Sequence, residues 1–436
     1  MRVAFRTLGC KVNQVETEQM KEDFLARGYE LVDFTREADV YIINTCTVTH
    51  ISDRKSRALI RRAIRNNPSA TIAAVGCMAQ VNADQLAGIE GLNLVVGNSD
   101  KEHMADIIEE YLADGSHVCK IFAGPMEART CLKAGGYTMH HQRTRGFIKI
   151  QDGCENYCSY CIVPYTRGPV RSKKPADVLM EIEQMLALGY RELVLTGIHT
   201  GLYGHDIPDW DIGKLLKEIF ARIKGRYRIR LSSIEPLEVS KTLIEVAASE
   251  PAFCRHLHIP LQSGSDNILR AMNRGYDSNY YKKMLNEISA QITDIALTTD
   301  IMVGFPTESE SDFMQSVELL QELPVYDLHV FQYSLRRGTD AALMSPQVNE
   351  SEKQRRSQLL INMARHKKNS FIKGLGNREM EVLVEKKIGP DLYQGLSDNY
   401  VQVELRSLQE ITGQFVNVVL GVNGIPVYKT PGTADR

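Results

Sequence analysis

The sequence has little of several features that would mark a specialised class of protein. It contains a single tryptophan, and its 52 basic and 54 acidic residues leave a formal net charge of −2. Proteins that bind nucleic acid over a whole surface are strongly basic, so any such contact here must come from local patches. No run approaches the ~20 apolar residues of a membrane-spanning helix. The N-terminus also lacks the apolar core of a secretion signal, which predicts a cytoplasmic chain without a membrane partner.

A disulfide framework is missing as well. The nine cysteines show no regular pairing pattern, and free thiols in a chain of 436 residues are typical of a reducing compartment. The length predicts about three domains of roughly 150 residues each. The changes in sequence character place them at residues 1–135, 136–370 and 371–436.

Six cysteines form two groups of three, and one group lies in a single short loop. Cys154, Cys158 and Cys161 have the spacing Cys-x3-Cys-x2-Cys and follow the apolar run Phe147–Ile150. Gaps this short let one loop surround an iron–sulfur cluster or a zinc ion. Structural zinc takes four ligands, so a loop with three thiolates either takes a fourth ligand from elsewhere or leaves one metal position open for a substrate or cofactor. Tyr160 offers a flat ring beside that position, on which a heteroaromatic group can rest.

This spacing, with an aromatic residue before the last cysteine, resembles the cluster loop of the radical S-adenosylmethionine (SAM) superfamily. The resemblance implies a 4Fe-4S cluster on Cys154, Cys158 and Cys161, with SAM bound at the open iron. The alternative is a structural zinc knuckle, although no matching Cys or His pair follows at the expected distance.

The second group of cysteines is spread over the first domain. Cys10, Cys46 and Cys77 each follow a predicted strand, at Val3–Leu8, Asp39–Ile43 and Ala70–Val75. Helical patterns lie between them at Gln14–Arg27 and Asp53–Asn66. Alternating strands and helices predict an open parallel α/β sheet whose strand ends share one edge, the usual ligand-binding edge of such sheets. We therefore expect the three thiols to converge as a second site for a 4Fe-4S cluster, with Asn13 and Asn44 beside it.

Together these motifs resemble the methylthiotransferase family. The resemblance rests on Thr7-Leu-Gly-Cys-Lys-Val-Asn13, Asn44-Thr-Cys-Thr-Val-Thr49, Gly76-Cys77 and the Cys154 loop. The Gly-Cys-Lys-Val-Asn form and Ser52-Asp-Arg-Lys-Ser56 are most similar to the branch that acts on N6-threonylcarbamoyladenosine in tRNA. The resemblance implies two 4Fe-4S clusters, SAM, an anticodon stem-loop as partner, an electron-donor protein, a sulfur source, and all six cysteines in catalysis.

The second domain repeats strand and helix six times. The strands are predicted to Ile150 and at Glu192–Thr196, Arg228–Leu231, His256–Ile259, Ile295–Ile301 and Leu328–Tyr333. Six such units predict a partial (β/α)6 barrel with its chemistry at the carboxyl ends of the strands, as in the radical SAM fold. By resemblance, the SAM site is lined at those ends by Gly197, Ser233, Glu235, Gln262, Asp300 and Gly304.

Three histidines lie on or near these strands. We expect His199, in a loop at the same edge, to line the site. His256 and His258 alternate on one strand and are expected to be packed or to line the barrel.

The last 66 residues differ from the two α/β regions in their predicted secondary structure. Short strands at Met380–Glu385, Tyr400–Leu405 and Phe415–Leu420, separated by turns, predict a small antiparallel β-barrel. It resembles the TRAM domain, which implies RNA binding. Its own basic residues are few: Lys386, Lys387 and Arg406.

Three clusters of basic residues lie outside the predicted small barrel. They are Arg54, Lys55, Arg57, Arg61, Arg62 and Arg65; Arg167, Arg171, Lys173 and Lys174; and Arg222, Lys224, Arg226, Arg228 and Arg230. Charge runs are usually solvated surface. The first, a helix with six cations and few acids, indicates a track for phosphates instead.

Three other functions stay open. The same chemistry on N6-isopentenyladenosine is disfavoured by Lys11-Val12. A ribosomal protein side chain is a second substrate class, which the cationic helix disfavours. A zinc-bound RNA-binding protein is a non-enzymatic third.

Overall fold

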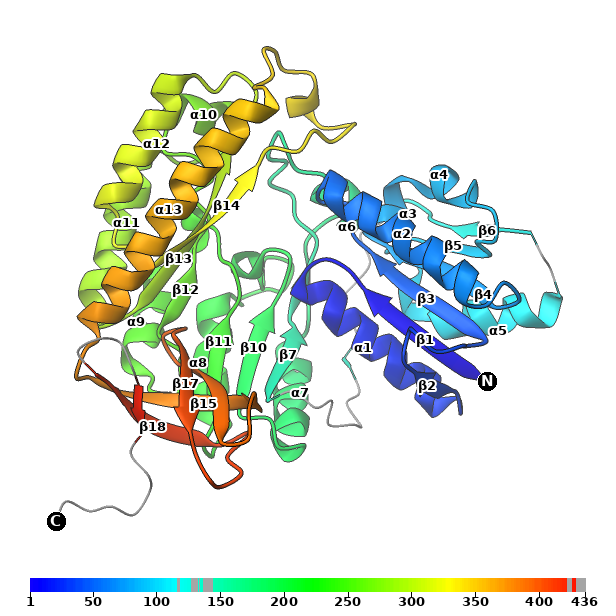
Figure 1. Ribbon diagram of the computed structural model, residues 1–436, viewed down its shortest axis with the longest axis horizontal. Helices are drawn as coiled ribbons and strands as arrows, with labels where there is room; N and C mark the ends of the chain where they lie inside the picture. The colour runs from blue at the N-terminus through cyan, green and yellow to red at the C-terminus, as the bar shows by residue number, and fades with distance from the viewer. Residues whose placement is uncertain (116–117, 127–131, 133, 136–143, 422–425, 429–436) are drawn as a thin grey trace. The chain divides into compact units, whose positions relative to one another are not determined.

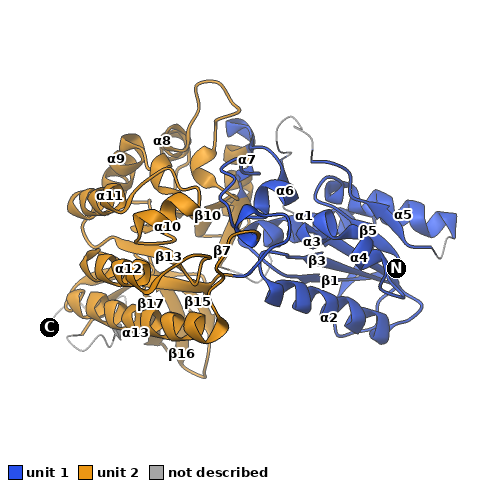
Figure 2. Ribbon diagram, turned by 90° about the horizontal axis from the view of Figure 1, so that it is seen from above, with its two compact units in different colours: residues 1–139, 149–177, 334–342 blue, residues 140–148, 178–333, 343–436 orange. Residues whose placement is uncertain are grey.

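The computed structural model describes residues 1–436 apart from 116–117, 127–131, 133, 136–143, 422–425 and 429–436. The described chain divides into two compact units, drawn in different colours in Figure 2. Unit 1 comprises residues 1–139, 149–177 and 334–342, and unit 2 comprises 140–148, 178–333 and 343–436. Our three-domain division stays a prediction, because part of the first boundary falls outside the described residues.

Unit 1 contains a parallel sheet of six strands. They are β1 Arg2–Thr7, β2 Glu30–Val32, β3 Val40–Thr45, β4 Thr71–Gly76, β5 Leu94–Val96 and β6 Lys120–Phe122. Their order is β2-β1-β3-β4-β5-β6. The direction of winding reverses between β1 and β3, and open α/β sheets bind ligands at such switch points.

Helices cover both faces of this sheet (Figure 1). They are α1 Lys11–Ala26, α2 His50–Asn66, α3 Cys77–Val81, α4 Ala83–Ala87 and α5 Met104–Asp114. Met20 and Phe24 of α1 and Ile108 of α5 pack on one face. Ile60 of α2 and Leu86 of α4 pack on the other. The predicted open α/β fold of this region is confirmed.

The cysteine loop of the predicted second domain also belongs to unit 1. It lies between two short antiparallel strands, β8 Gln151–Asp152 and β9 Arg171–Ser172, and contains helix α6 Val163–Arg167.

Unit 2 holds the partial barrel. Its strands are β7 Arg145–Lys149, which runs into unit 1 at its last residue, β10 Glu192–Thr196, β11 Arg228–Leu231, β12 His256–His258, β13 Ala296–Val303 and β14 Asp327–Gln332. β7, β10 and β11 form one sheet and β12, β13 and β14 another. The Cys254 amide donates to the Ile229 carbonyl at 2.8 Å and joins the two. The six predicted strands are confirmed.

Helices surround these strands, as Figure 1 shows. They are α7 Pro175–Ala187, α8 Ile212–Arg222, α9 Lys241–Ser249, α10 Asp266–Ala271, α11 Ser278–Gln291, α12 Glu310–Glu322 and α13 Glu350–Gly374. The long helix α13 runs along the last strand, β14.

The C-terminal region of unit 2 is a small antiparallel barrel. Its strands are β15 Glu379–Lys387, β16 Leu392–Ser397, β17 Gln402–Arg406, β18 Phe415–Leu420 and β19 Pro426–Tyr428, in the order β17-β16-β15-β18-β19. Its core includes Ala296 and Tyr326, which lie at the amino ends of β13 and β14. The small barrel therefore packs on the end of the partial barrel opposite the predicted site.

Candidate cluster and cofactor sites

Cys10, Cys46 and Cys77 come together at the switch point of the first sheet. Cys10 caps the N-terminus of α1 after β1, Cys46 follows β3, and Cys77 begins α3 after β4. A Cβ placed on Gly9 would lie 3.1 Å from the Cys46 sulfur, so this glycine lets the Cys10 and Cys46 loops approach closely. The expected convergence of thiols from three separate strands is present.

The thiols influence one another electrostatically. Burial by the surrounding protein raises the pKa of the Cys10 thiol, although part of its surface is exposed. The charge of Arg167 lowers this pKa, and the nearby Cys77 thiol raises it further. Burial, and then the Cys77 thiol, also raise the pKa of Cys46. Three close thiols need a cationic partner to be thiolates together, and Arg167 is such a partner.

Two asparagines hold the loops that carry these thiols. Asn13 Nδ2 donates to the carbonyls of Leu8 at 2.8 Å and Thr45 at 3.1 Å, which joins the ends of β1 and β3. Asn98 Nδ2 donates to the Cys77 sulfur at 3.4 Å. Asn13 belongs to the motif around Cys10 and was predicted from it, whereas Asn98 lies in a loop without a motif and was not predicted.

Cys154, Cys158 and Cys161 lie on the loop between β8 and α6, and each is partly exposed. The Cys161 amide donates to the Cys158 carbonyl at 2.8 Å, which closes a tight turn. Gly153 has φ +77°, and a Cβ there would meet the Pro169 carbonyl at 1.9 Å. This position therefore requires glycine.

Both cysteine groups suit iron–sulfur clusters by the chemistry of their donors. None of the six cysteines forms a disulfide, and each group offers three soft ligands. Cys10, Cys46 and Cys77 would hold one cluster, and Cys154, Cys158 and Cys161 the other. Tyr160 lies half-buried within the second group.

The residues predicted to contact SAM lie at carboxyl ends of strands in unit 2. Gly197 follows β10, and Ser233 and Glu235 follow β11. Glu235 forms an ion pair with Arg274, a residue that the sequence analysis missed. Gln262 follows β12 with φ +68°, and its backbone bonds β13 by donating to the Asp300 carbonyl at 2.9 Å.

Gly304 and His199 lie at the same ends of the strands. Gly304, after β13, has φ +72° and donates its amide to Glu308 Oε2 at 2.6 Å. His199 is buried, with Nε2 3.1 Å from Glu238 Oε2. Its role in lining the site stays a prediction, as do the SAM contacts.

Three side chains on β12, β13 and β14 form a polar cluster. The ligand atoms of His258, Asp300 and His329 all lie within 4.8 Å of one another. Burial alone would raise the pKa of Asp300, but hydrogen bonds from His258 and His329 lower it to about 2. The packing expected for His256 is present, since its ring stacks on Tyr400 at 4.2 Å. His329 was missed because it stands alone in the sequence.

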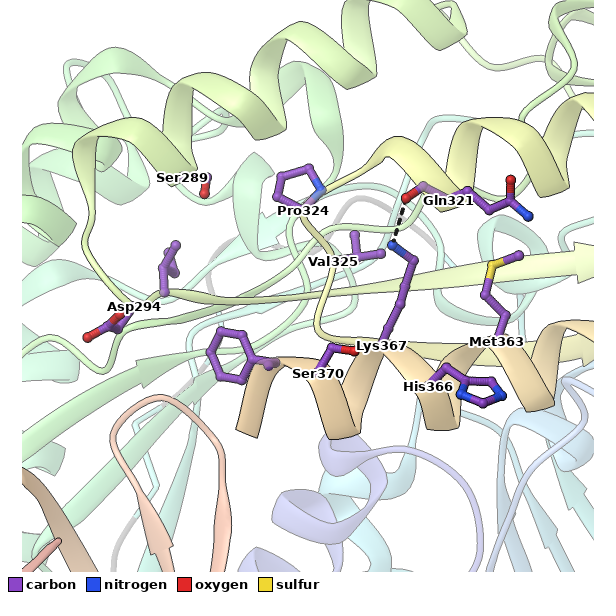
Figure 3. A pocket seen from close by; sticks show the side chains of 11 residues that line it. Ser289, Asp294, Gln321, Pro324, Val325, Met363, His366, Lys367 and Ser370 are labelled. Atoms are coloured by element: carbon purple, nitrogen blue, oxygen red, sulfur yellow. Dashed lines mark hydrogen bonds between the residues drawn. The ribbon is translucent and has the colours of Figure 1, made fainter. Parts of the chain in front are cut away.

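A pocket of about 590 Å³ lies elsewhere in unit 2 (Figure 3). Asp294, Ile295 and Val325 line it at the amino ends of β13 and β14, opposite the predicted site residues. Lys367 spans it and donates to the Leu323 carbonyl at 2.9 Å and the Gln321 carbonyl at 3.3 Å. These bonds already use its ammonium group, so we assign the pocket no chemistry.

The three clusters of cations have different environments. On α2, Arg54, Lys55, Arg61, Arg62 and Arg65 are exposed and Arg57 is half-buried. In the second cluster, Arg167, Arg171 and Lys173 are buried, and in the third, Arg228 and Arg230 are buried. The general expectation of solvated charge is wrong for these five residues. Arg167, Arg171, Arg228 and Arg230 pair with the buried carboxylates of Glu16, Asp152 and Glu192.

These five buried residues offer no surface to a nucleic acid, whereas Lys174, Arg222, Lys224 and Arg226 of the same clusters are exposed. Arg167 contacts Glu16 and Asp152, each at 2.9 Å. Arg228 and Arg230 both contact Glu192, at 2.5 and 2.7 Å. No helix among the described residues is both long and apolar enough to cross a membrane.

Comparison with known proteins identifies the class first. Residues 148–320 match the Radical SAM superfamily, and residues 2–97 match "Uncharacterized protein family UPF0004". The structure of the radical SAM methyltransferase TsrM from Kitasatospora setae is similar over 78% of this chain and 77% of its own, with a TM-score of 0.63 and 14% identity. The chain is thus a radical SAM protein, whose fold class implies a 4Fe-4S cluster and SAM.

Relatives that match nearly the whole chain identify its family within the radical SAM superfamily. The threonylcarbamoyladenosine tRNA methylthiotransferase MtaB of Bacillus subtilis is 40% identical over 97% of this chain and 94% of its own length. MtaB of Aquifex aeolicus is 37% identical over 96% of this chain and 100% of its own. The chain belongs to the methylthiotransferase family of radical SAM enzymes, as its motifs predicted.

Proposed function

We propose that this enzyme adds a methylthio group to C2 of N6-threonylcarbamoyladenosine next to the anticodon of tRNA. The observation that carries the proposal is the full-length similarity to MtaB, which extends across both cysteine groups. Relatives that are named tRNA-2-methylthio-N(6)-dimethylallyladenosine synthase, such as those of Hydrogenobaculum and Carboxydothermus hydrogenoformans, are 32% and 34% identical. The higher identity to the MtaB proteins of Bacillus subtilis and Aquifex aeolicus, at 40% and 37%, favours the threonylcarbamoyl substrate.

The proposal requires two 4Fe-4S clusters with separate tasks. Cys154, Cys158 and Cys161 would hold the cluster that binds SAM, and Cys10, Cys46 and Cys77 an auxiliary cluster that carries the sulfur. When bound, the first cluster and SAM supply a radical strong enough to take hydrogen from the unactivated C2 of adenine. The protein's own part is to hold each group of thiols, to seat SAM and to present the base.

Three features of the chain support the binding of SAM. Tyr160 offers a ring beside the cluster loop, on which an adenine can stack. Gly197 and Gly304 let backbone approach a charged ligand closely. Gln262 is held in a positive-φ conformation by its bonds to β13, and such strain is concentrated at ligand sites. Ser233, Glu235 and Asp300 complete the polar set that we assign to SAM.

Helix α2 supports tRNA as the partner. Its exposed cations face solvent without a matching set of acids, since Asp53 is the single acidic residue on the helix and it pairs with Arg336 at 2.6 Å. Such a helix attracts phosphates and releases their counterions. We also assign RNA binding to the TRAM-like barrel at residues 371–436, although Arg406 there is paired with Asp391.

The chemistry needs two further partners. An electron-donor protein must reduce the SAM-binding cluster, and a sulfur source must renew the sulfur that leaves with each product. The eight cysteines in the described part of the chain form no disulfide, which supports work in the reducing cytoplasm.

The experiment that tests the proposal measures tRNA nucleosides by mass spectrometry in cells with and without the gene. We expect the 2-methylthio derivative of N6-threonylcarbamoyladenosine to disappear and its precursor to rise. If this nucleoside is unchanged and the isopentenyl derivative is lost, the substrate assignment is wrong. If both persist, a ribosomal protein becomes the candidate substrate.

A purified variant tests the division of tasks. Cys10→Ala removes one ligand of the auxiliary cluster, so SAM cleavage should persist while the methylthio product falls below detection. Cys119→Ala, which removes a thiol outside both groups, should keep both activities. Product formation by Cys10→Ala would contradict the assignment, and a zinc-containing, iron-free wild type would favour the RNA-binding alternative.

A further inference from the structure

Unit 1 contains a buried ionic network between its two groups of cysteines. We use this name for Glu16, Lys101, Lys149, Asp152, Arg167 and Arg171, all of which are buried. Glu16 contacts Lys101 at 2.6 Å, Lys149 at 2.7 Å and Arg167 at 2.9 Å. Asp152 contacts Lys149 at 2.6 Å, Arg167 at 2.9 Å and Arg171 at 3.3 Å.

The network has more positive than negative charge. Four cations face two carboxylates, which leaves an excess of two positive charges. Glu16 stays ionised, because Arg167, Lys101 and Lys149 lower its pKa against the effect of burial. Burial and Arg167 lower the pKa of Lys101 to about 8, so it is still mostly charged at pH 7. Burying a charge without a counterion costs free energy, so the excess positive charge of the network favours an anion nearby.

The network reaches every loop of the auxiliary group. Arg167 donates to Asn13 Oδ1, and Asn13 holds the ends of the strands that precede Cys10 and Cys46. Lys101 donates to Asn98 Oδ1 at 2.6 Å, and Asn98 donates to the Cys77 sulfur. Burial opposes the charged form of Arg167, but Asp152 and Glu16, and after them the thiols of Cys77 and Cys10, raise its pKa.

The same arginine belongs to the other cysteine loop. Arg167 ends α6, six residues after Cys161, and its partner Asp152 stands two residues before Cys154. Asn98 also donates to the Thr166 carbonyl at 2.8 Å. One guanidinium therefore connects the loops of both groups.

We propose that Arg167 is a positioning residue whose charge, with that of its network, compensates the auxiliary cluster and raises its reduction potential. A cluster with three thiolates becomes more negative when it gains an electron, so a nearby positive charge favours the reduced state. The inference rests on the proposed auxiliary cluster on Cys10, Cys46 and Cys77. No bond is made or broken by Arg167 itself.

The test is redox potentiometry, followed by electron paramagnetic resonance, on the full-length reconstituted protein. Cys154, Cys158 and Cys161 are changed to Ala in every sample, so that the signal comes from the auxiliary cluster alone. In this background Arg167→Gln should move the midpoint potential to more negative values. Arg167→Lys, which keeps the charge but loses the paired hydrogen bonds, should stay nearer to the unmodified arginine.

The matched control is Arg356→Gln. Arg356 is likewise buried and ion-paired, with Glu308 at 2.6 Å, but belongs to unit 2 and lies outside the network. Its substitution should leave the potential unchanged. An unchanged potential in Arg167→Gln, or an equal shift in Arg167→Lys and Arg167→Gln, would overturn the inference.

Two further outcomes concern a variant that does not fold and a protein that binds no iron. If Arg167→Gln does not fold, Lys101→Met removes another positive charge of the network and should also lower the potential; no shift there would refute the charge mechanism. If the protein with Arg167 intact binds no iron in the Cys154, Cys158 and Cys161 triple-Ala background, the auxiliary cluster itself is refuted, and the inference fails with it.

Discussion

At the scale of single residues, backbone conformation shapes the cluster loop. Gly153 and Tyr157 both have positive φ, at +77° and +41°, on either side of Cys154. Glycine adopts such values without strain, but other residues rarely do, so the backbone strain of this loop lies at Tyr157. The cysteine spacing alone did not predict the positive φ angles at these two positions.

Gly153→Ala should destabilise the loop and prevent it from holding a cluster. The added methyl group would overlap the Pro169 carbonyl, and positive φ alone costs about 1 kcal/mol or more for alanine. We expect iron bound at Cys154, Cys158 and Cys161 to be lost, as measured by iron content and visible absorbance.

Gly28→Ala is the control, because Gly28 has φ +83° but no described atom within 4 Å of an added Cβ. It should cost about 1 kcal/mol from conformation alone and leave iron content intact. Equal iron contents in the two variants would show that the close approach at Gly153 is unimportant.

At the scale of elements, helix α2 combines two functions on opposite faces. Ile60 and Ala63 are buried in the core of the first sheet. The cations point to solvent, so they can be changed with little effect on folding. The charge pattern distinguished this helix from the other two basic clusters, but it did not reveal that five of their nine residues are buried.

Changing Arg54, Arg61, Arg62 and Arg65 together to Gln should weaken binding of tRNA. Each lost phosphate contact should lower the slope of log K against log salt by about 1. Binding by filter or fluorescence anisotropy at several salt concentrations measures both effects. Melting temperature should change little.

The control changes three exposed lysines of unit 2, Lys217, Lys241 and Lys283, to Gln. If this variant loses as much affinity per charge as the α2 variant, the tRNA responds to net charge only, and α2 is not a specific track.

At the scale of the whole molecule, buried ion pairs connect segments that are distant in sequence. In unit 2, Glu192 on β10 binds Arg228 and Arg230 on β11. These arginines donate in turn to carbonyls of the small barrel, at Leu396 and Ser397. Glu192 thus supports the attachment of the C-terminal barrel to the partial barrel.

This attachment should depend on pH. Burial opposes ionisation of Glu192, but Arg230 and Arg228 lower its pKa from about 4.5 to about 2. Because the folded-state pKa lies below the unfolded one, the stabilisation is complete above about pH 4.5 and is lost as pH falls toward 2. The shift corresponds to about 3 kcal/mol. Denaturant unfolding at a series of pH values measures it.

Glu192→Gln should remove this pH dependence and cost about 3 kcal/mol or more at pH 7, since it leaves buried arginines without their carboxylate. Glu322→Gln breaks the exposed pair with Lys282 and should cost less than about 1 kcal/mol. A cost for Glu192→Gln as small as that would mean that water or other groups compensate the arginines.

The sequence by itself determined the features that depend on local chemistry. The spacing of Cys154, Cys158 and Cys161 defines a three-thiol loop without reference to the rest of the chain. Alternating strand and helix patterns determined both α/β regions, because side-chain periodicity follows the burial of each element.

The tertiary structure decided which distant residues meet. Cys10, Cys46 and Cys77 share a site because β1, β3 and β4 are neighbours in a parallel sheet, an order that no local pattern specifies. The pairing of Arg167 with Glu16 spans 151 residues. Charge in the sequence does not reveal its own partner, since ion pairing depends on distance in space and on burial, and only the fold determines these.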